Sequence, residues 1–110
     1  MRRGERLARP SEHRRWQLQT AERQVRAELG RAETDLASVQ ERTALARERY
    51  RAFTERLTLV ERSVRVGETA FVELVRARAG VFEADIARLR SNIAVLQARS
   101  RLNQVLGLVP

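Results

Sequence analysis

The chain has 110 residues, of which 43% are hydrophobic and 33% charged, with only 5 Gly and 2 Pro. So few breakers in a chain this charged argue against a sandwich, a barrel or a loop-rich fold, and they favour long helices or a coiled coil. The net charge is +8 and all 22 basic residues are Arg. This excess is greatest in residues 1–15. Beyond them Arg and Glu are interleaved, as on the solvated face of a helix.

Several classes of protein conflict with these residues. The absence of Cys excludes disulfides and thiolate metal sites. No stretch of 18 apolar residues is present, so the chain does not span a bilayer as a helix. No apolar core follows the charged start, so we expect no export signal in the chain itself.

The first helix is predicted over about residues 11–65. Residues 1–10 end at Pro10 and are predicted as a basic flexible arm, with Ser11 as a plausible N-cap. Residues at alternating steps of four and three are apolar or aromatic, with Thr43 as the exception, and they form the predicted seam: Val25, Leu29, Ala32, Leu36, Val39, Thr43, Ala46, Tyr50, Phe53, Leu57, Val60 and Val64. A 4-3 repeat of this length predicts a coiled-coil seam. Gly30 is interpreted as a tolerated glycine.

The residues Val66, Gly67, Glu68 and Thr69 interrupt this repeat. Gly67 can adopt the left-handed conformation that closes a helix, and Thr69 can cap the next one. Because one helix ends and another begins within about four residues, the two must run antiparallel. The sequence therefore predicts an all-α fold, a long coiled-coil hairpin over residues 11–110 with helices at about 11–65 and 70–106.

The second helix carries two apolar stripes. The one predicted to be its seam comprises Val72, Val75, Ala79, Phe82, Ile86, Leu89, Ile93 and Leu96. A flanking stripe, expected to be exposed in an isolated hairpin, comprises Leu74, Ala77, Val81, Ala84, Val95, Ala98 and Leu102. A helix with two stripes contacts more than one neighbour, so the chain is predicted to have helical partners. Gly107 and Pro110 are expected to end this helix.

Residues with catalytic or ligand-binding potential form no recognisable pattern. His13 stands alone in the basic region, and we expect it to be exposed. The carboxylates lie beside Arg, and no glycine-rich phosphate loop is present. Tyr50, Phe53 and Phe82 are interpreted as packing residues rather than stacking platforms, and Trp16 receives no role. We therefore expect no enzyme activity, cofactor or metal.

Three pieces of the sequence resemble the final helical hairpin of TolC-like outer-membrane efflux proteins. The first is the tip, from Ser63 to Val75, and the second is the Ala-rich stretch from Arg76 to Asp85. The third is the closing segment Asn103 to Gly107, which follows the tip glycine at the spacing that the family shows. The resemblance covers most of the chain.

This resemblance implies a passive channel. Family members are homotrimers whose helices form a periplasmic tunnel continuous with an outer-membrane barrel. Their hairpin tips meet a periplasmic adaptor (membrane fusion) protein that couples them to an inner-membrane pump exporting drugs, metal ions or other solutes. The adaptor-docking tip would here be Val66, Gly67, Glu68 and Thr69, with Val64 and Thr69 at the tip-flanking aperture positions. The Tyr and Arg of the family's latch are not found there.

The sequence departs from this family in having neither barrel strands nor a first half, so the resemblance is to a fragment of the tunnel. One alternative is a stand-alone coiled-coil interaction or adaptor hairpin. Another is a basic helical nucleic-acid binder, whose affinity would fall steeply with salt. The interleaved glutamates argue against it, and no nucleic-acid partner is expected.

Overall fold

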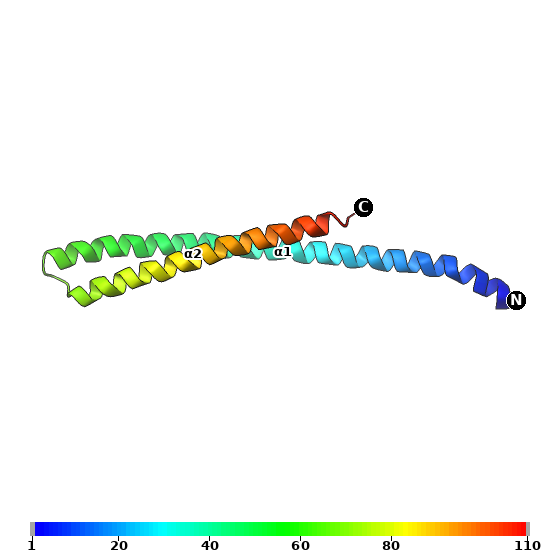
Figure 1. Ribbon diagram of the computed structural model, residues 1–110, viewed down its shortest axis with the longest axis horizontal. Coiled ribbons are helices and arrows are strands. Elements are labelled where there is room, and N and C mark those ends of the chain that lie inside the picture. Colours follow the sequence, from blue (N-terminus) through cyan, green and yellow to red (C-terminus); the bar gives the residue numbers. More distant parts are fainter. Residues whose placement is uncertain (1, 110) are drawn as a thin grey trace.

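The protein folds into two antiparallel helices joined by a short turn (Figure 1). The computed structural model describes the backbone of residues 2–109 and the side chains of residues 10–109. Helix α1 spans Arg2–Arg65 and helix α2 spans Phe71–Leu106. Within the described residues there is no strand, and the predicted all-helical hairpin is confirmed.

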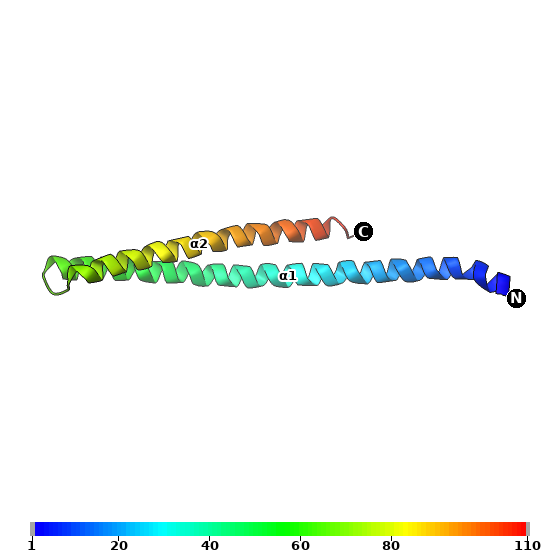
Figure 2. The same ribbon diagram turned by 60° about the horizontal axis from the view of Figure 1, so that its bottom comes forward.

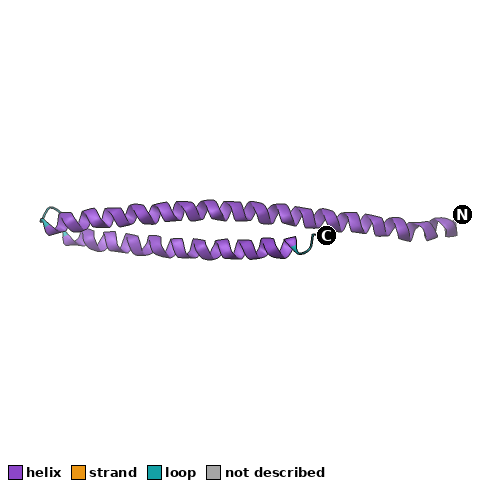
Figure 3. Cartoon of the chain, turned by 90° about the horizontal axis from the view of Figure 1, so that it is seen from above, coloured by secondary structure: helices purple, strands orange, loops and turns teal. Residues whose placement is uncertain are grey.

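The hairpin is long and thin, with extents of 97 × 21 × 13 Å. At about 1.5 Å per residue, the 64 residues of α1 account for nearly the whole of this length. Figure 2 shows that α2 lies along the part of α1 next to the turn, and that α1 continues alone toward the N-terminus. The view from above in Figure 3 shows the same overhang. The expected inequality of the two arms is therefore present.

The start of α1 differs from the prediction. The helix begins at Arg2 rather than near residue 11, and both Pro10 and the expected N-cap Ser11 lie inside it. Proline removes one backbone donor, but its fixed φ is close to the helical value, so the helix continues at the cost of one hydrogen bond. The side chains of residues 1–9 lie outside the described part of the chain, and the flexibility of the predicted arm stays a prediction.

The turn closes α1 through Gly67, as the sequence predicts. Gly67 has a φ of +76°. Its amide donates to the carbonyl of Val64 at 3.1 Å, and the amide of Glu68 donates to the carbonyl of Ser63 at 2.9 Å. These two bonds form a Schellman motif, which satisfies carbonyls that the end of a helix leaves without partners.

The start of α2 differs from the prediction in its cap. The N-cap is Ala70, in an extended conformation and without a side-chain hydrogen bond, so Thr69 does not cap the helix. The hydroxyl of Thr69 instead pairs with the hydroxyl of Ser63 across the turn. Thr69 lies one position before the N-cap, so its hydroxyl is not at the position from which a side chain caps the helix. Glu73 lies in the first turn of α2.

The predicted seam of α1 is confirmed along its whole length. All twelve of its positions are buried or half-buried, and the helix surface between them is mostly exposed. Thr43 is the buried polar member, at 6% exposure. Its hydroxyl lies 2.8 Å from the carbonyl oxygen of Val39 and 3.3 Å from that of Ser91 on α2. The one polar residue in the repeat is therefore satisfied within the interface.

On α2 the two stripes are exchanged relative to the prediction. The inner stripe, which packs against α1, contains all seven residues expected to flank the seam: Leu74, Ala77, Val81, Ala84, Val95, Ala98 and Leu102. It also contains Arg88, Ser91 and Val105, which the prediction did not include. The predicted seam is instead the outer stripe, and it faces solvent: Val72, Val75, Ala79, Phe82, Ile86, Leu89, Ile93 and Leu96. Of these eight residues only Ile86 is half-buried, and the others are exposed.

Side-chain volume explains this exchange. The seam of α1 carries the bulky Tyr50 and Phe53 in its middle, so close approach of α2 requires small residues at some of the facing positions. The inner stripe provides Ala at residues 77, 84 and 98 and Ser at residue 91. Beside it lies Gly80, where a Cβ atom would come within 2.9 Å of the Phe53 ring. The bulkier outer stripe cannot approach α1 as closely.

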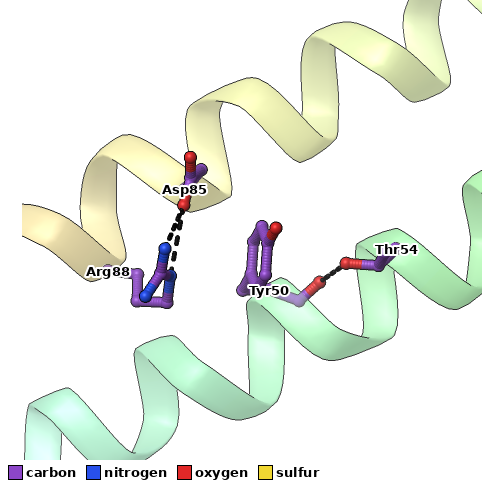
Figure 4. Close-up of polar contacts among 4 residues, drawn as sticks. All are labelled: Tyr50, Thr54, Asp85 and Arg88. Atoms are coloured by element: carbon purple, nitrogen blue, oxygen red, sulfur yellow. Dashed lines mark hydrogen bonds and ion pairs between the residues drawn. The ribbon is translucent and has the colours of Figure 1, made fainter.

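Two polar contacts mark the register of the helices in this interface. Arg88 occupies an inner-stripe position, and its guanidinium lies 4.9 Å from the centre of the Tyr50 ring. Figure 4 shows Arg88 held in place by Asp85, one turn earlier on α2, through two hydrogen bonds of 2.6 and 3.1 Å. Nearby, Thr43 approaches the Ser91 carbonyl. A polar contact in an apolar seam favours one register, because slippage would leave the polar groups without partners.

Candidate functional site: the hairpin tip and the outer stripe of α2

The hairpin tip presents an apolar and acidic surface. Val66 is 69% exposed and Phe71 is 65% exposed, on the two sides of the turn. Gly67 and Glu68 between them are exposed as well. Two uncovered apolar side chains next to a carboxylate form a small surface that a partner protein could cover, and the Schellman motif fixes its backbone.

The five residues singled out from the sequence divide into two groups. Val66, Gly67 and Glu68 lie on the surface of the tip, where a partner could reach them. Val64 and Thr69 are half-buried: Val64 belongs to the seam of α1, and Thr69 pairs with Ser63. The structure brings all five into one turn. Their docking and aperture roles stay predictions.

The second candidate surface is the outer stripe of α2. Apart from the half-buried Ile86, the exposed fractions of its large side chains range from 49% at Leu89 to 66% at Phe82. They form a continuous apolar band along most of the helix, on the side facing away from α1. A monomeric soluble protein rarely exposes a contiguous apolar surface of this length, so the outer stripe is the second candidate for an interaction surface.

The sequence identifies the residues of the outer stripe as an apolar stripe, but the prediction that this stripe packs against α1 is wrong. Both stripes of α2 repeat at steps of three and four, so spacing does not distinguish them. The signal that distinguishes them is residue size, because the column of Ala and Ser at every seventh position suits the bulky centre of the α1 seam. The expectation of more than one helical neighbour depends only on there being two stripes.

Among residues 10–109 the polar surface offers no comparable site. An open groove lies where α1 passes the end of α2, lined by Gly30, Asp35, Arg101 and Val105. Its ion pair, between Arg101 and Asp35 at 3.8 Å, is exposed. Among the described residues no group of three or more His, Asp or Glu side chains could hold a metal ion. The described helices also include none apolar enough over a sufficient length to cross a membrane.

The aromatic residues at the N-terminal end of α1 form one local contact. Trp16 is 62% exposed and stacks on His13, with 6.1 Å between ring centres. His13 is exposed, as expected, and its ring lies 3.1 Å from the side-chain amide of Gln17. All three residues are on one face of α1, beyond the end of α2, and nothing in the described chain packs on them.

Fold and surfaces together define a class: a long antiparallel helical hairpin with an apolar stripe left open on its shorter helix. Comparison with protein-family models, with curated proteins and with solved structures found no match for the chain. Its function is therefore inferred from the hairpin itself.

Proposed function

We propose that the hairpin is a wall segment of a helical tunnel of the TolC-like type, a component of a tripartite efflux system. The observation that supports this proposal is that α2 carries apolar stripes on two sides, one covered by α1 and one uncovered. A helix with a neighbour on each side needs two such stripes, and α2 has them, whereas α1 carries one apolar stripe and supports the proposal only through its contact with α2. The resemblance of the tip and closing segments agrees with this arrangement.

The tip has a distinct role in the proposal. Val66, Gly67 and Glu68 would contact a periplasmic adaptor protein, and the inner-membrane pump would be reached only through that adaptor. The exposure of Val66 and Glu68 supports this role, because both side chains are free to be covered. In this arrangement the chain is a passive component at the periplasmic side of the outer membrane, and it supplies a surface rather than a reaction.

A direct experiment measures binding of the chain to a purified periplasmic adaptor protein. The variants Val66→Asp and Glu68→Arg should each weaken binding on the order of tenfold, because a central interface residue typically contributes more than about 1 kcal/mol. A matched control is Glu48→Arg, which makes the same change on the exposed surface of α1 and should leave the affinity unchanged.

Two results would overturn the efflux proposal. One is a gene neighbourhood with neither an adaptor nor a pump. The other is adaptor binding that is insensitive to both tip variants.

The second candidate function is a stand-alone coiled-coil hairpin that binds helices of another protein. The continuous length of the outer stripe favours it, since one amphipathic helix could lie along it. The two functions differ at the tip: a stand-alone hairpin would bind its partner through Phe82 and Leu89 and would be insensitive to Val66→Asp.

A further inference from the structure

The outer stripe is itself a complete coiled-coil seam. Its residues recur at steps of three and four, and they define four heptads over residues 72–99. A heptad repeat of this length, flanked by charged residues, is the pattern of a coiled coil rather than of scattered surface hydrophobes. Because α1 already covers the inner stripe on the other side of α2, the outer seam is free to receive another helix.

The residue types in this seam specify how many helices it joins. Its first heptad position holds Val72, Ala79, Ile86 and Ile93, and its fourth holds Val75, Phe82, Leu89 and Leu96. These correspond to the positions a and d of a coiled coil. β-branched residues at a with Leu at d favour two parallel strands over three or four. The C-terminal half of the seam follows this rule fully, with Ile at residues 86 and 93 and Leu at residues 89 and 96.

The flanking residues specify the orientation. In a parallel in-register pair, a residue at position g lies near the residue five positions later on the other copy. Arg78 would then face Glu83 of a second copy, and Arg90 of that copy would approach Asp85, which also pairs with Arg88 on its own helix. Asn92 and Gln97 would form a polar pair in the same relation. Each contact occurs twice by symmetry, and none joins like charges.

An antiparallel pairing of the same helix lacks this match. With the eight apolar residues fully overlapped, residue 84 would lie at the centre of the pair. Glu83 would then approach Glu83 of the second copy, Asp85 would approach Asp85, and Arg76 would approach Arg90. Like charges at such positions are unfavourable, and they select against this orientation.

We propose that a second copy of this chain docks on the outer stripe, so that the two α2 helices form a parallel two-stranded coiled coil. The four helices then lie in the order α1, α2, α2, α1, with both hairpin tips at the same end. This inference goes beyond the tunnel function and does not depend on it. It names a dimer that fills the stripe which a neighbouring helix would cover in a TolC-like trimer, so the two arrangements exclude each other on this stripe.

Single-cysteine variants test the relative orientation of the two α2 helices. No other thiol can form a disulfide in this experiment, because the chain has no Cys. In the parallel pair every d residue faces its own counterpart, so Val75→Cys and Leu89→Cys should each form a disulfide-linked dimer by itself. In an antiparallel pair, disulfides would form instead between Val75→Cys and Ile93→Cys when the two variants are mixed. Leu45→Cys is the control, because Leu45 is similarly exposed but lies on α1.

Charge reversal tests the flanking contacts by sedimentation equilibrium. Glu83→Arg should weaken dimerisation on the order of tenfold, because it replaces two attractive contacts with repulsive ones. Combining it with Arg78→Glu should restore the wild-type affinity, since the pairs are re-formed with exchanged signs. Circular dichroism of each variant shows whether the hairpin itself remains helical.

The outcomes separate the alternatives. A dimer with self-crosslinking at residues 75 and 89 and rescue by the double reversal establishes the proposal. A monomer at all concentrations, a trimer, or crosslinking only in the mixed sample overturns it. A trimer that leaves residues 75 and 89 uncrosslinked overturns this interface while leaving the tunnel function standing, so the two failures are distinguishable.

Discussion

Three glycines have different structural roles, although each is simply a glycine in the sequence. Gly67 closes α1 with a positive φ, Gly80 admits the ring of Phe53, and Gly30 has nothing within 4 Å of the position a Cβ would occupy. Substituting Ala at each position therefore separates backbone strain, close packing and helix propensity.

At Gly67 the cost is conformational. Ala at this position must adopt the left-handed region, which costs an L-residue roughly 1–2 kcal/mol. No side chain lies within 4 Å of the built Cβ, so steric contact adds nothing. We expect Gly67→Ala to lower the free energy of unfolding by about 1 kcal/mol, measured by urea denaturation followed by circular dichroism. An unchanged midpoint would mean that the Schellman turn is not formed in solution.

Gly30 and Gly80 form a matched pair inside helices. Gly30→Ala should stabilise the chain by about 0.5–1 kcal/mol, because Ala has the higher helix propensity and meets no neighbour. Gly80→Ala gains the same propensity but places its Cβ 2.9 Å from the Phe53 ring, and such overpacking typically costs about 1–3 kcal/mol. We expect a net loss of stability at Gly80 in the same denaturation experiment. Equal gains at both sites would contradict the packing of Phe53.

At the scale of a helix, α2 is unusual in having two apolar sides. The contrast between Ala84, which is 6% exposed on the inner stripe, and Ala79, which is exposed on the outer stripe, makes this testable. The two alanines differ in environment but share a residue type and a helix.

Replacing each of these alanines by Leu should give opposite results. Ala84→Leu forces three extra carbons into the interface near Phe53, so it should destabilise the hairpin by about 1–3 kcal/mol. Ala79→Leu adds the same atoms on the solvent side, and within an isolated hairpin it should change stability by less than about 0.5 kcal/mol. Thermal unfolding at low protein concentration compares the two. If the effects were exchanged, α2 would face α1 with its outer stripe.

At the scale of the whole molecule, stability is distributed unevenly along α1. The segment that pairs with α2 holds the buried residues, whereas the overhang toward the N-terminus, with Trp16 and Leu18 exposed, has no in-chain partner. A helix without tertiary contacts depends on propensity alone and opens easily.

Trp16 offers a measurement of this difference, because it is the single tryptophan and lies in the overhang. Its fluorescence should show a solvent-exposed emission maximum in native buffer and should change little across the main unfolding transition. Circular dichroism should report that transition in full. A buried emission spectrum that shifts together with the circular dichroism signal would show that the overhang is covered, by a second copy or by another protein.

The sequence determined much of this molecule by itself. The 4-3 repeat from Val25 to Val64 identified the seam of α1, because only one stripe on that helix is apolar at this spacing. Gly67 identified the turn, because the left-handed conformation has a residue-specific cost. The N-terminal boundary of α1 is harder to predict from the sequence, because Pro10 disfavours a continuing helix but does not forbid it.

Only the tertiary structure decided which side of α2 meets α1. Both stripes have the period of a coiled coil, and the bulkier one is the more hydrophobic, so periodicity and hydrophobicity pointed to the wrong side. The choice depends on the volumes of Tyr50 and Phe53 on the facing helix, and that information exists only once the two helices are in register. Close packing therefore placed the small residues inside, and it left the larger stripe, from Val72 to Leu96, mostly exposed to solvent.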